Sequence, residues 1–412
     1  MIAEVLQMDT AGLIAIPRRD GTKLDTRFST LHCSLDQSSL ESFMSPRSSF
    51  ATLAISAFIA GAGFAQSVAA DPTHSLKKVA SFDHQVTGVT ASESGRLFVN
   101  FPRWTEDSEV SVAELLPDGD LKSYPDAKWN GWRNALQDSL TANDRWVCVQ
   151  SVVADKKGNL WVIDAGAPAQ AQVVPGGPKL VKIDLASNSV AKVYPFGLDV
   201  APQGSYLNDV RLSPDGKFAY ITDSGTSGAI VVLNLETGQA RRALDGAPST
   251  QFEKGLMVKA DGKPLQRPDG RGVQFSADGI ALSPNGDTLY WQAVKGKTLY
   301  QIPTAALQTS PLADLSKSVE KVGDNGPADG LLMDSAGTLY VSSVEDHSIK
   351  VRKGGQLSVL LQDKDMRWPD TFTQGPDGTI YVTDSRIPDM NFYDPKQAPA
   401  LKTSLYKIVT KD

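Results

Sequence analysis

Short runs that alternate apolar and polar residues, separated by turns rich in glycine and proline, make up most of the chain after residue 71. The clearest run is YLNDVRLSPDGKFAYITDSG, in which apolar positions flank the turn Pro214-Asp215-Gly216. Alternation of this kind around such a turn predicts a β-hairpin. Helical patterns are scarce, so we expect an all-β domain.

This hairpin belongs to a unit that recurs six times. A turn glycine followed by a strand of the Leu-Tyr-Val type occurs at Gly95, Gly158, Gly216, Gly286, Gly337 and Gly378. A second hairpin follows in most units, which makes four strands per unit. Six such units predict a six-bladed β-propeller with four-stranded antiparallel blades, whereas a β-sandwich would not explain the repeated internal order. The last unit holds only three strands, so we expect residues 75–82 to supply the fourth and close the ring.

One residue in each unit lies eight positions before the turn glycine, where the first strand begins. These residues are Thr87, Gln150, Asn208, Asp278, Asp329 and Asp370. The first strand of a propeller blade lines the central channel. We therefore expect the six side chains to meet around the axis and to bind a ligand, together with Asp209 beside Asn208.

Three of the six are carboxylates, which cannot all stay ionised at close range without help. Two like charges about 4 Å apart repel by roughly 4 kcal/mol at an effective dielectric of 20. Either their pKa values rise or a cation lies among them. Oxygen ligands suit Ca²⁺ first and Mg²⁺ or Mn²⁺ next. The expected ligands are Asn208, Asp278, Asp329 and Asp370, and no organic cofactor is expected.

A simpler interpretation of the same aspartates is that they cap the loop. An Asp-Gly pair at a strand start, as at Asp278 and Asp329, can bond neighbouring backbone amides. Asp164, Asp223 and Asp384 end second strands, and we expect them to cap turns at the opposite end of each blade.

Further candidates for chemistry lie outside the six positions. If the protein is an enzyme, Asp329, Asp278 and His84 are the candidate catalytic residues, and His84 would be a general base unless it lies in a surface loop. Arg103 and Trp104, in a long loop, are expected to wall a pocket for an aromatic or cationic ligand, or else to pack between blades. Cys148 alternates within an apolar strand and is expected to be a buried, inert thiol.

The N-terminal residues look different from the rest. Residues 44–70 contain one positive charge, an apolar stretch and the small-residue end Val68-Ala69-Ala70, which is typical of a secretory signal peptide rather than a membrane anchor. Residues 1–43 would then be a non-native extension before a start at Met44, and residues 71–412 the propeller. We expect a secreted or periplasmic monomer with no membrane contact after cleavage. The net charge is −6 and no basic run occurs, so nucleic acid is not an expected partner.

Several segments resemble the major royal jelly protein/yellow family. They are TGVTASESGRLFVNFPRW, GNLWVIDAG, YLNDVRLSPDGKFAYITDSGTSGAIVVLNLETGQARRAL, DGIALSPNGDTLYWQAVKGKTLYQIPTAAL and RWPDTFTQGPDGTIYVTDSRI. The resemblance runs in order through nearly all of residues 71–412. It implies a six-bladed, secreted propeller linked to pigment pathways, to binding of small aromatic amines at the channel mouth, or to nutrition and signalling.

A more distant resemblance is to propellers of the gluconolactonase/regucalcin type, whose channel metal is held by a Glu, an Asn and an Asp. It implies that Asp329 is the metal-binding Asp and that Asn208 faces substrate. Asp278 stands where that family has its metal-binding Asn, and Thr87 where it has its Glu. The loss of that Glu weighs against lactonase chemistry.

Three functional hypotheses follow. The first is binding of a small, aromatic or amine-bearing molecule at the channel, with a channel cation. The second is a metal-dependent hydrolase of the lactonase type, in which a cation polarises a carbonyl and activates water. The third is a non-catalytic interaction scaffold.

Overall fold

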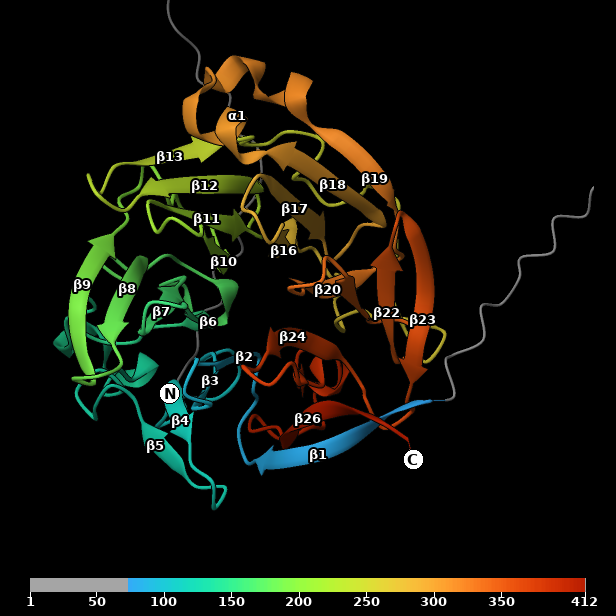
Figure 1. Ribbon diagram of the computed structural model, residues 1–412. Helices are drawn as coiled ribbons and strands as arrows, with labels where there is room; N and C mark the ends of the chain where they lie inside the picture. The colour runs from blue at the N-terminus through green and yellow to red at the C-terminus, as the bar shows by residue number, and fades with distance from the viewer. Residues whose placement is uncertain (1–72, 412) are drawn as a thin grey trace, which may run out of the picture. The chain divides into compact units, whose positions relative to one another are not determined.

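The computed structural model describes residues 73–411, which form six four-stranded antiparallel sheets arranged around one axis (Figure 1). The all-β, six-bladed propeller predicted from the repeat is confirmed. Residues 1–43 and 44–70, predicted to be an extension and a signal peptide, lie outside the described residues.

Five blades run outward from the axis in chain order, and the sixth ends on β1. The blades are β2 (Gly88–Ala91), β3 (Leu97–Asn100), β4 (Val112–Leu115) and β5 (Leu121–Ser123); β6 (Val149–Ala154), β7 (Asn159–Asp164), β8 (Lys179–Asp184) and β9 (Ser189–Pro195); β10 (Leu207–Leu212), β11 (Phe218–Asp223), β12 (Ala229–Asn234) and β13 (Ala240–Ala243); β16 (Ala277–Leu282), β17 (Thr288–Ala293), β18 (Thr298–Pro303) and β19 (Glu320–Asp324); β20 (Ala328–Met333), β21 (Leu339–Ser343), β22 (Ser348–Lys353) and β23 (Gln356–Gln362); β24 (Pro369–Gln374), β25 (Ile380–Asp384), β26 (Thr403–Thr410) and β1 (His74–Phe82). The innermost strands surround the centre of the ring in Figure 1.

The sixth blade joins the two ends of the described chain. β1 pairs antiparallel with β26, from His74 opposite Thr410 to Phe82 opposite Thr403. The strand order β1-β26-β25-β24 makes β1 the outermost strand of a sheet whose other three strands come from the last part of the chain.

The repeated hairpin turn has the same backbone conformation in every blade. The six turn glycines have φ between +77° and +83°, a region that residues with a Cβ seldom adopt. These glycines are Gly95, Gly158, Gly216, Gly286, Gly337 and Gly378. The sequence repeat is therefore a repeat of one turn geometry, which sets the register of the first two strands in each blade.

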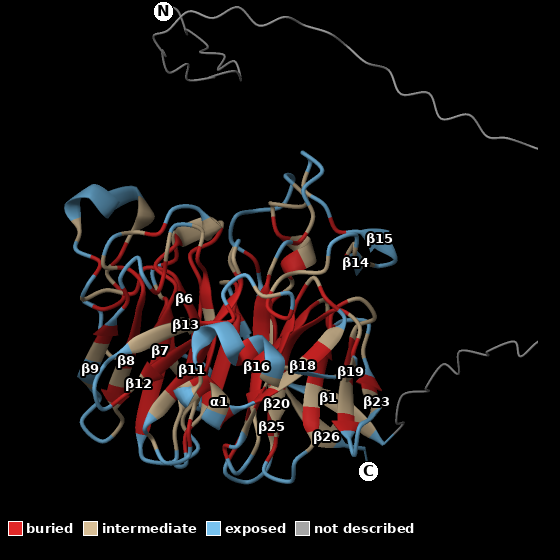
Figure 2. Ribbon diagram, turned by 90° about the horizontal axis from the view of Figure 1, so that it is seen from above, coloured by how far each residue is buried: buried red, intermediate tan, exposed pale blue. Residues whose placement is uncertain are grey.

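Most of the remaining structure is loops and short helices between blades. The connection between β13 and β16 is the longest and carries the hairpin of β14 (Lys259–Ala260) and β15 (Lys263–Pro264). Figure 2 shows this hairpin above the blades, whose strands are largely buried. The helix α1 (Thr304–Thr309) and the 3-10 helix η3 (Leu312–Ser318) connect β18 to β19. Within residues 73–411, no helix is both long and apolar enough to cross a membrane.

Inner strands of neighbouring blades approach so closely that glycine is required between them. A Cβ on Gly279 would lie 2.0 Å from the carbonyl oxygen of Asp329, and one on Gly330 would lie 1.9 Å from that of Asp370. Real Cβ atoms do not come this close to an oxygen. The glycine that follows Asp278 and Asp329 is thus a packing requirement of the ring rather than part of a loop cap.

We predict that Gly279→Ala destabilises the propeller by about 3 kcal/mol or more, because backbone rather than a side chain must move to admit the methyl group. Gly337→Ala is the matched control: nothing lies within 4 Å of its Cβ position, and its φ of +79° makes alanine cost about 1 to 2 kcal/mol. Urea unfolding of both variants measures the difference. An equal decrease in the free energy of unfolding of the two variants would contradict the close approach of the inner strands at Gly279.

Candidate functional site

The six positions predicted from the repeat all line one pocket on the propeller axis. Its volume is about 20 Å³. The lining residues are Thr87, Gln150, Asn208, Asp278, Asp329 and Asp370, together with Trp104, Tyr206, Asp209, Phe275, Thr371 and Ile387. We call this cavity the axial pocket. Each of the six blades contributes to it, so its shape depends on the whole ring.

A β-bulge positions most of these side chains. In five blades the pairing of the first and second strands shifts register at the predicted residue, as between Leu207 and Val210 around Asn208 and Asp209. A bulge leaves residues unpaired and turns their side chains in a new direction. This explains why two residues of low strand propensity, Asn208 and Asp209, begin a buried strand.

In two blades, a threonine hydroxyl group on the second strand accepts from the backbone amide that the bulge exposes. Thr222 Oγ1 accepts from the amide of Asp209 at 3.2 Å and donates to the carbonyl of Asp278 in the next blade at 2.6 Å. Thr383 does the same between Thr371 and Thr87. These two hydroxyl groups link the third blade to the fourth and the sixth blade to the first.

Four carboxyl groups line the axial pocket and are at most 8% exposed: Asp209, Asp278, Asp329 and Asp370. Burial, and then repulsion from Asp329, hold the pKa values of Asp278 and Asp370 well above the ordinary range. Burial raises the pKa of Asp329 to about 6, although the Trp368 indole N–H, which donates to its Oδ2 at 2.6 Å, favours the ionised form. A hydrogen bond between Asp278 and Asp329 further raises the pKa of Asp278.

The donor atoms of the axial pocket are oxygens, which Ca²⁺ prefers. Among residues 73–411, no three His, Cys, Asp or Glu side chains are grouped as a metal ion requires. One oxygen of Asp329 already accepts from Trp368. The calcium site predicted at Asn208, Asp278, Asp329 and Asp370 stays a prediction.

The hydrogen bonds do not support the simpler interpretation, in which these aspartates cap the loop by accepting from backbone amides. In the described part of the chain, no backbone amide donates to the carboxyl groups of Asp278, Asp329 or Asp370 within hydrogen-bond distance. Their oxygens instead face the pocket or other side chains.

An arginine crosses the channel just beyond the axial pocket. Arg211 lies on β10 three residues past Asn208, and its Nη2 donates to the carbonyl of Leu331 on β20 at 2.8 Å. These strands belong to blades that are not neighbours, so the guanidinium spans the channel. It lies 3.9 Å from Asp209 Oδ2. Arg211 supplies one fixed positive charge against four carboxyl groups.

Aromatic side chains form one wall of the axial pocket. The Trp104 indole N–H donates to the hydroxyl of Tyr206, and the Cys148 sulfur lies 3.4 Å from that oxygen. Burial raises the pKa of Cys148 to about 12 and that of Tyr206 well above its ordinary value. Cys148 is therefore a buried neutral thiol, as predicted, and Trp104 lines the pocket.

The three aspartates at the ends of second strands lie at the pocket end of the blades, not at the opposite end as expected. Antiparallel pairing places Asp164 opposite Val149, Asp223 opposite Leu207, and Asp384 opposite Pro369. The expectation was wrong because an antiparallel second strand ends where the first begins. All three do cap backbone amides, as the bonds to Val147, Cys148, Tyr206 and Trp368 show.

These caps position residues of the site. Asp223 Oδ1 accepts from the Tyr206 amide at 2.7 Å. Asp384 Oδ1 accepts from the Trp368 amide at 2.8 Å, and the indole of Trp368 in turn donates to Asp329. Asp384 is thus a positioning residue, because it orients the side chain that holds Asp329.

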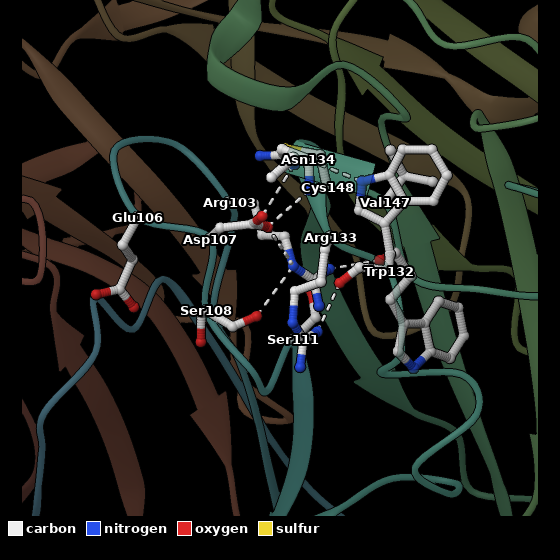
Figure 3. A network of polar contacts seen from close by, with 12 residues as sticks. Arg103, Glu106, Asp107, Ser108, Ser111, Trp132, Arg133, Asn134, Val147 and Cys148 are labelled. Carbon is white, nitrogen blue, oxygen red and sulfur yellow. Dashed lines mark hydrogen bonds and ion pairs between the residues drawn. The ribbon is translucent and has the colours of Figure 1, made fainter. Parts of the chain in front are cut away.

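Arg103 does not line the axial pocket. It is completely buried and donates to the backbone carbonyls of Ser108, Asn130 and Trp146, and Figure 3 shows it at the centre of this network. Asp107 lies 3.7 Å from it. Arg103 ties the long loop between the first two blades together, which agrees with the packing alternative for this residue.

His84 also lies apart from the axial pocket. It lines a separate cavity of about 320 Å³ with Glu109 and Arg133, and its Nδ1 lies 2.6 Å from Glu106 Oε1. The bond with Glu106 raises the pKa of His84. The structure therefore does not bring this candidate base to Asp278 and Asp329.

A second, larger cavity adjoins the axial pocket. Its volume is about 550 Å³, and it shares Tyr206 and Phe275 with the axial pocket. We call it the vestibule. Its lining comprises residues 169–171, 204–206, 224–226 and 271–275 with Phe252, Arg267 and Tyr393.

Several site residues escaped the sequence analysis. Tyr206 lies two positions before Asn208, so a step of ten residues back from the turn glycine finds it. Arg211 stands among the apolar positions of β10 and could have been noticed as the one positive charge in that strand. Phe275 lies in a loop and Ile387 in a short 3-10 helix (Ile387–Asp389), and neither carries a comparable signal.

The fold and the axial pocket define a six-bladed propeller with a polar site on its axis. Residues 147–397 match the family model described as major royal jelly protein, and the chain belongs to this family. It is 27% identical to major royal jelly protein 1 of Apis mellifera over 233 residues, which are 52% of this chain and 49% of that protein. Identity to major royal jelly protein 5 of the same species is 24% over 272 residues, or 62% and 42%. The chain spans about half the length of these relatives.

Solved structures agree in fold. The structure of a putative gluconolactonase superposes with a TM-score of 0.51 over 83% of this chain and 94% of that one, at 13% sequence identity. At this identity the likeness concerns the fold alone.

The buried carboxyl groups predict how stability depends on pH in the absence of ligand. The folded protein keeps protons on Asp278, Asp329 and Asp370 that the unfolded chain has lost above about pH 4. The native state then binds more protons, so these groups lower the free energy of unfolding as pH rises from about 4 to 7.

We therefore predict that Asp278→Asn stabilises the ligand-free protein by about 1 to 2 kcal/mol at pH 7, and by much less at pH 4. Denaturant unfolding at several pH values measures this difference. Asp138→Asn, in the exposed part of a 3-10 helix (Asn134–Ser139), is the control and should change stability equally at both pH values. A loss of stability in Asp278→Asn that is independent of pH would show that the carboxyl groups do not repel one another.

Proposed function

We propose that the propeller binds a small organic molecule through a primary ammonium group, which enters the axial pocket while the rest of the molecule occupies the vestibule. The observation that supports this most is the convergence of four buried carboxyl groups on a pocket that also has aromatic walls. A cation among these groups offsets the repulsion that raises their pKa values.

The sizes of the two cavities favour a ligand with a small charged end and a larger body. A volume of about 20 Å³ admits one group the size of a water molecule. The vestibule, at about 550 Å³, falls in the range of small-molecule sites. A terminal ammonium fits the first cavity and an aromatic ring fits the second.

The chemistry of the walls favours an organic cation. An ammonium group has three N–H donors, and carboxylates are acceptors that bind it by charge-assisted hydrogen bonds. The faces of Trp104, Tyr206 and Phe275 add attraction for a cation or stacking for a flat ligand. The amine-binding resemblance stated above for the royal jelly/yellow family agrees with this assignment.

A divalent cation is the alternative occupant, and it would support lactonase-type hydrolysis. The all-oxygen donor set favours it. Export of the protein, its monomeric state and the absence of a nucleic-acid partner stay predictions, since they depend on the N-terminal residues and the composition rather than on the axial pocket.

We predict that 2-phenylethylamine binds to the protein, measured by calorimetry, and that Asp278→Asn weakens this binding about tenfold, or about 1.4 kcal/mol. Affinity should rise as pH increases through about 6, because ionised carboxyl groups bind ammonium better and Asp329 titrates there. The neutral analogue 2-phenylethanol is the control ligand and should not bind measurably.

The same preparation distinguishes the alternative. Stoichiometric Ca²⁺ or Mn²⁺, with turnover of a lactone that Asp329→Ala abolishes, would favour the hydrolase and contradict amine binding as the main function. Binding of neither amine nor metal would leave the scaffold hypothesis.

A further inference from the structure

We infer that the ligand also carries a negatively charged group, which the vestibule binds through Arg267. This inference rests on the proposed function, because it takes the axial pocket as the site of the ammonium group. It narrows the ligand from an amine to a dipolar molecule whose two charges stand at opposite ends of an aromatic body.

The two adjoining cavities have opposite charge. The axial pocket is lined by four aspartates, whereas the charged side chains that line the vestibule are Arg267 and Arg271. A third cation, Lys295, lies 4.6 Å from the ring centroid of the wall residue Phe252. A molecule that fills both cavities therefore meets negative charge at one end and positive charge at the other.

Arg267 is the cation whose charge is available to a ligand. Its guanidinium stacks 4.5 Å from the ring centroid of Phe392, and the side chain is half-buried. Among residues 73–411, no carboxylate lies within ion-pair distance of it. Arg271 differs, because its Nη2 lies 2.6 Å from Asp269 and both side chains are exposed.

The shared walls limit what can connect the two ends. Tyr206 and Phe275 line both cavities, so the part of the ligand between the charges passes aromatic side chains. Flat or aromatic groups stack favourably there. An arginine fork pairs with a carboxylate or a phosphate through two parallel hydrogen bonds, which makes either group a suitable negative end.

Matched ligands test this inference. We would measure the affinities of 2-phenylethylamine and 4-(2-aminoethyl)benzoate, which differ by one carboxylate, and of the shorter pair benzylamine and 4-(aminomethyl)benzoate. We expect the carboxylate to increase affinity about tenfold in at least one pair. In Arg267→Gln that ratio of affinities should fall to about one, and Arg267→Lys should restore part of it.

The control variant is Lys317→Gln, which removes one exposed positive charge from the segment between β18 and β19. The gain in affinity from the carboxylate should be the same in this variant as in the wild type. If amines bind but the carboxylate brings no gain in either pair, or if Arg267→Gln keeps the gain, this inference is overturned while the proposed function stands. If no amine binds, the proposed function fails, and this inference fails with it.

Discussion

The crowding of carboxyl groups on a common axis is the constraint on which the rest of this structure depends. A propeller brings one strand start from each blade to the same small volume, and here four buried aspartates meet in about 20 Å³ with Arg211 as the fixed cation nearby. Such an arrangement costs stability unless protons or a bound cation reduce the repulsion. The protein retains this cluster of aspartates despite its cost in stability. This indicates a functional rather than a packing role, because functional sites commonly lower stability in this way.

The surrounding structure holds that cluster in place from several directions. Bulges turn the side chains toward the axis, the hydroxyl groups of Thr222 and Thr383 join two of these bulges to the next blade, and close glycine contacts set the spacing of the blades. Asp384 orients Trp368, which donates to Asp329. The geometry of the axial pocket therefore depends on contacts in all parts of the ring. A substitution within one blade would alter the positions of the side chains at the axis.

Much of this could be predicted from the sequence, because a repeat fixes equivalent positions without any knowledge of their contacts. One offset from a turn glycine located Asn208, Asp278 and four further lining residues. The offset does not show that the second strand runs antiparallel to the first. Asp223, at the end of its strand, was therefore assigned to the end of the blade away from the pocket, although it lies at the pocket end. Nor could the offset place loop residues such as Phe275, His84 and Arg103, whose positions depend on long-range packing and not on the repeat.

The most direct test of the account is to count the protons released when an amine binds. Calorimetric titration of 2-phenylethylamine near pH 6, in buffers of different ionisation enthalpy, gives this number. Because the free cluster retains protons that a bound ammonium would displace, we predict release of about one proton per molecule bound. Binding of the amine without proton release would contradict the claim that the axial carboxyl groups share protons until a cation joins them.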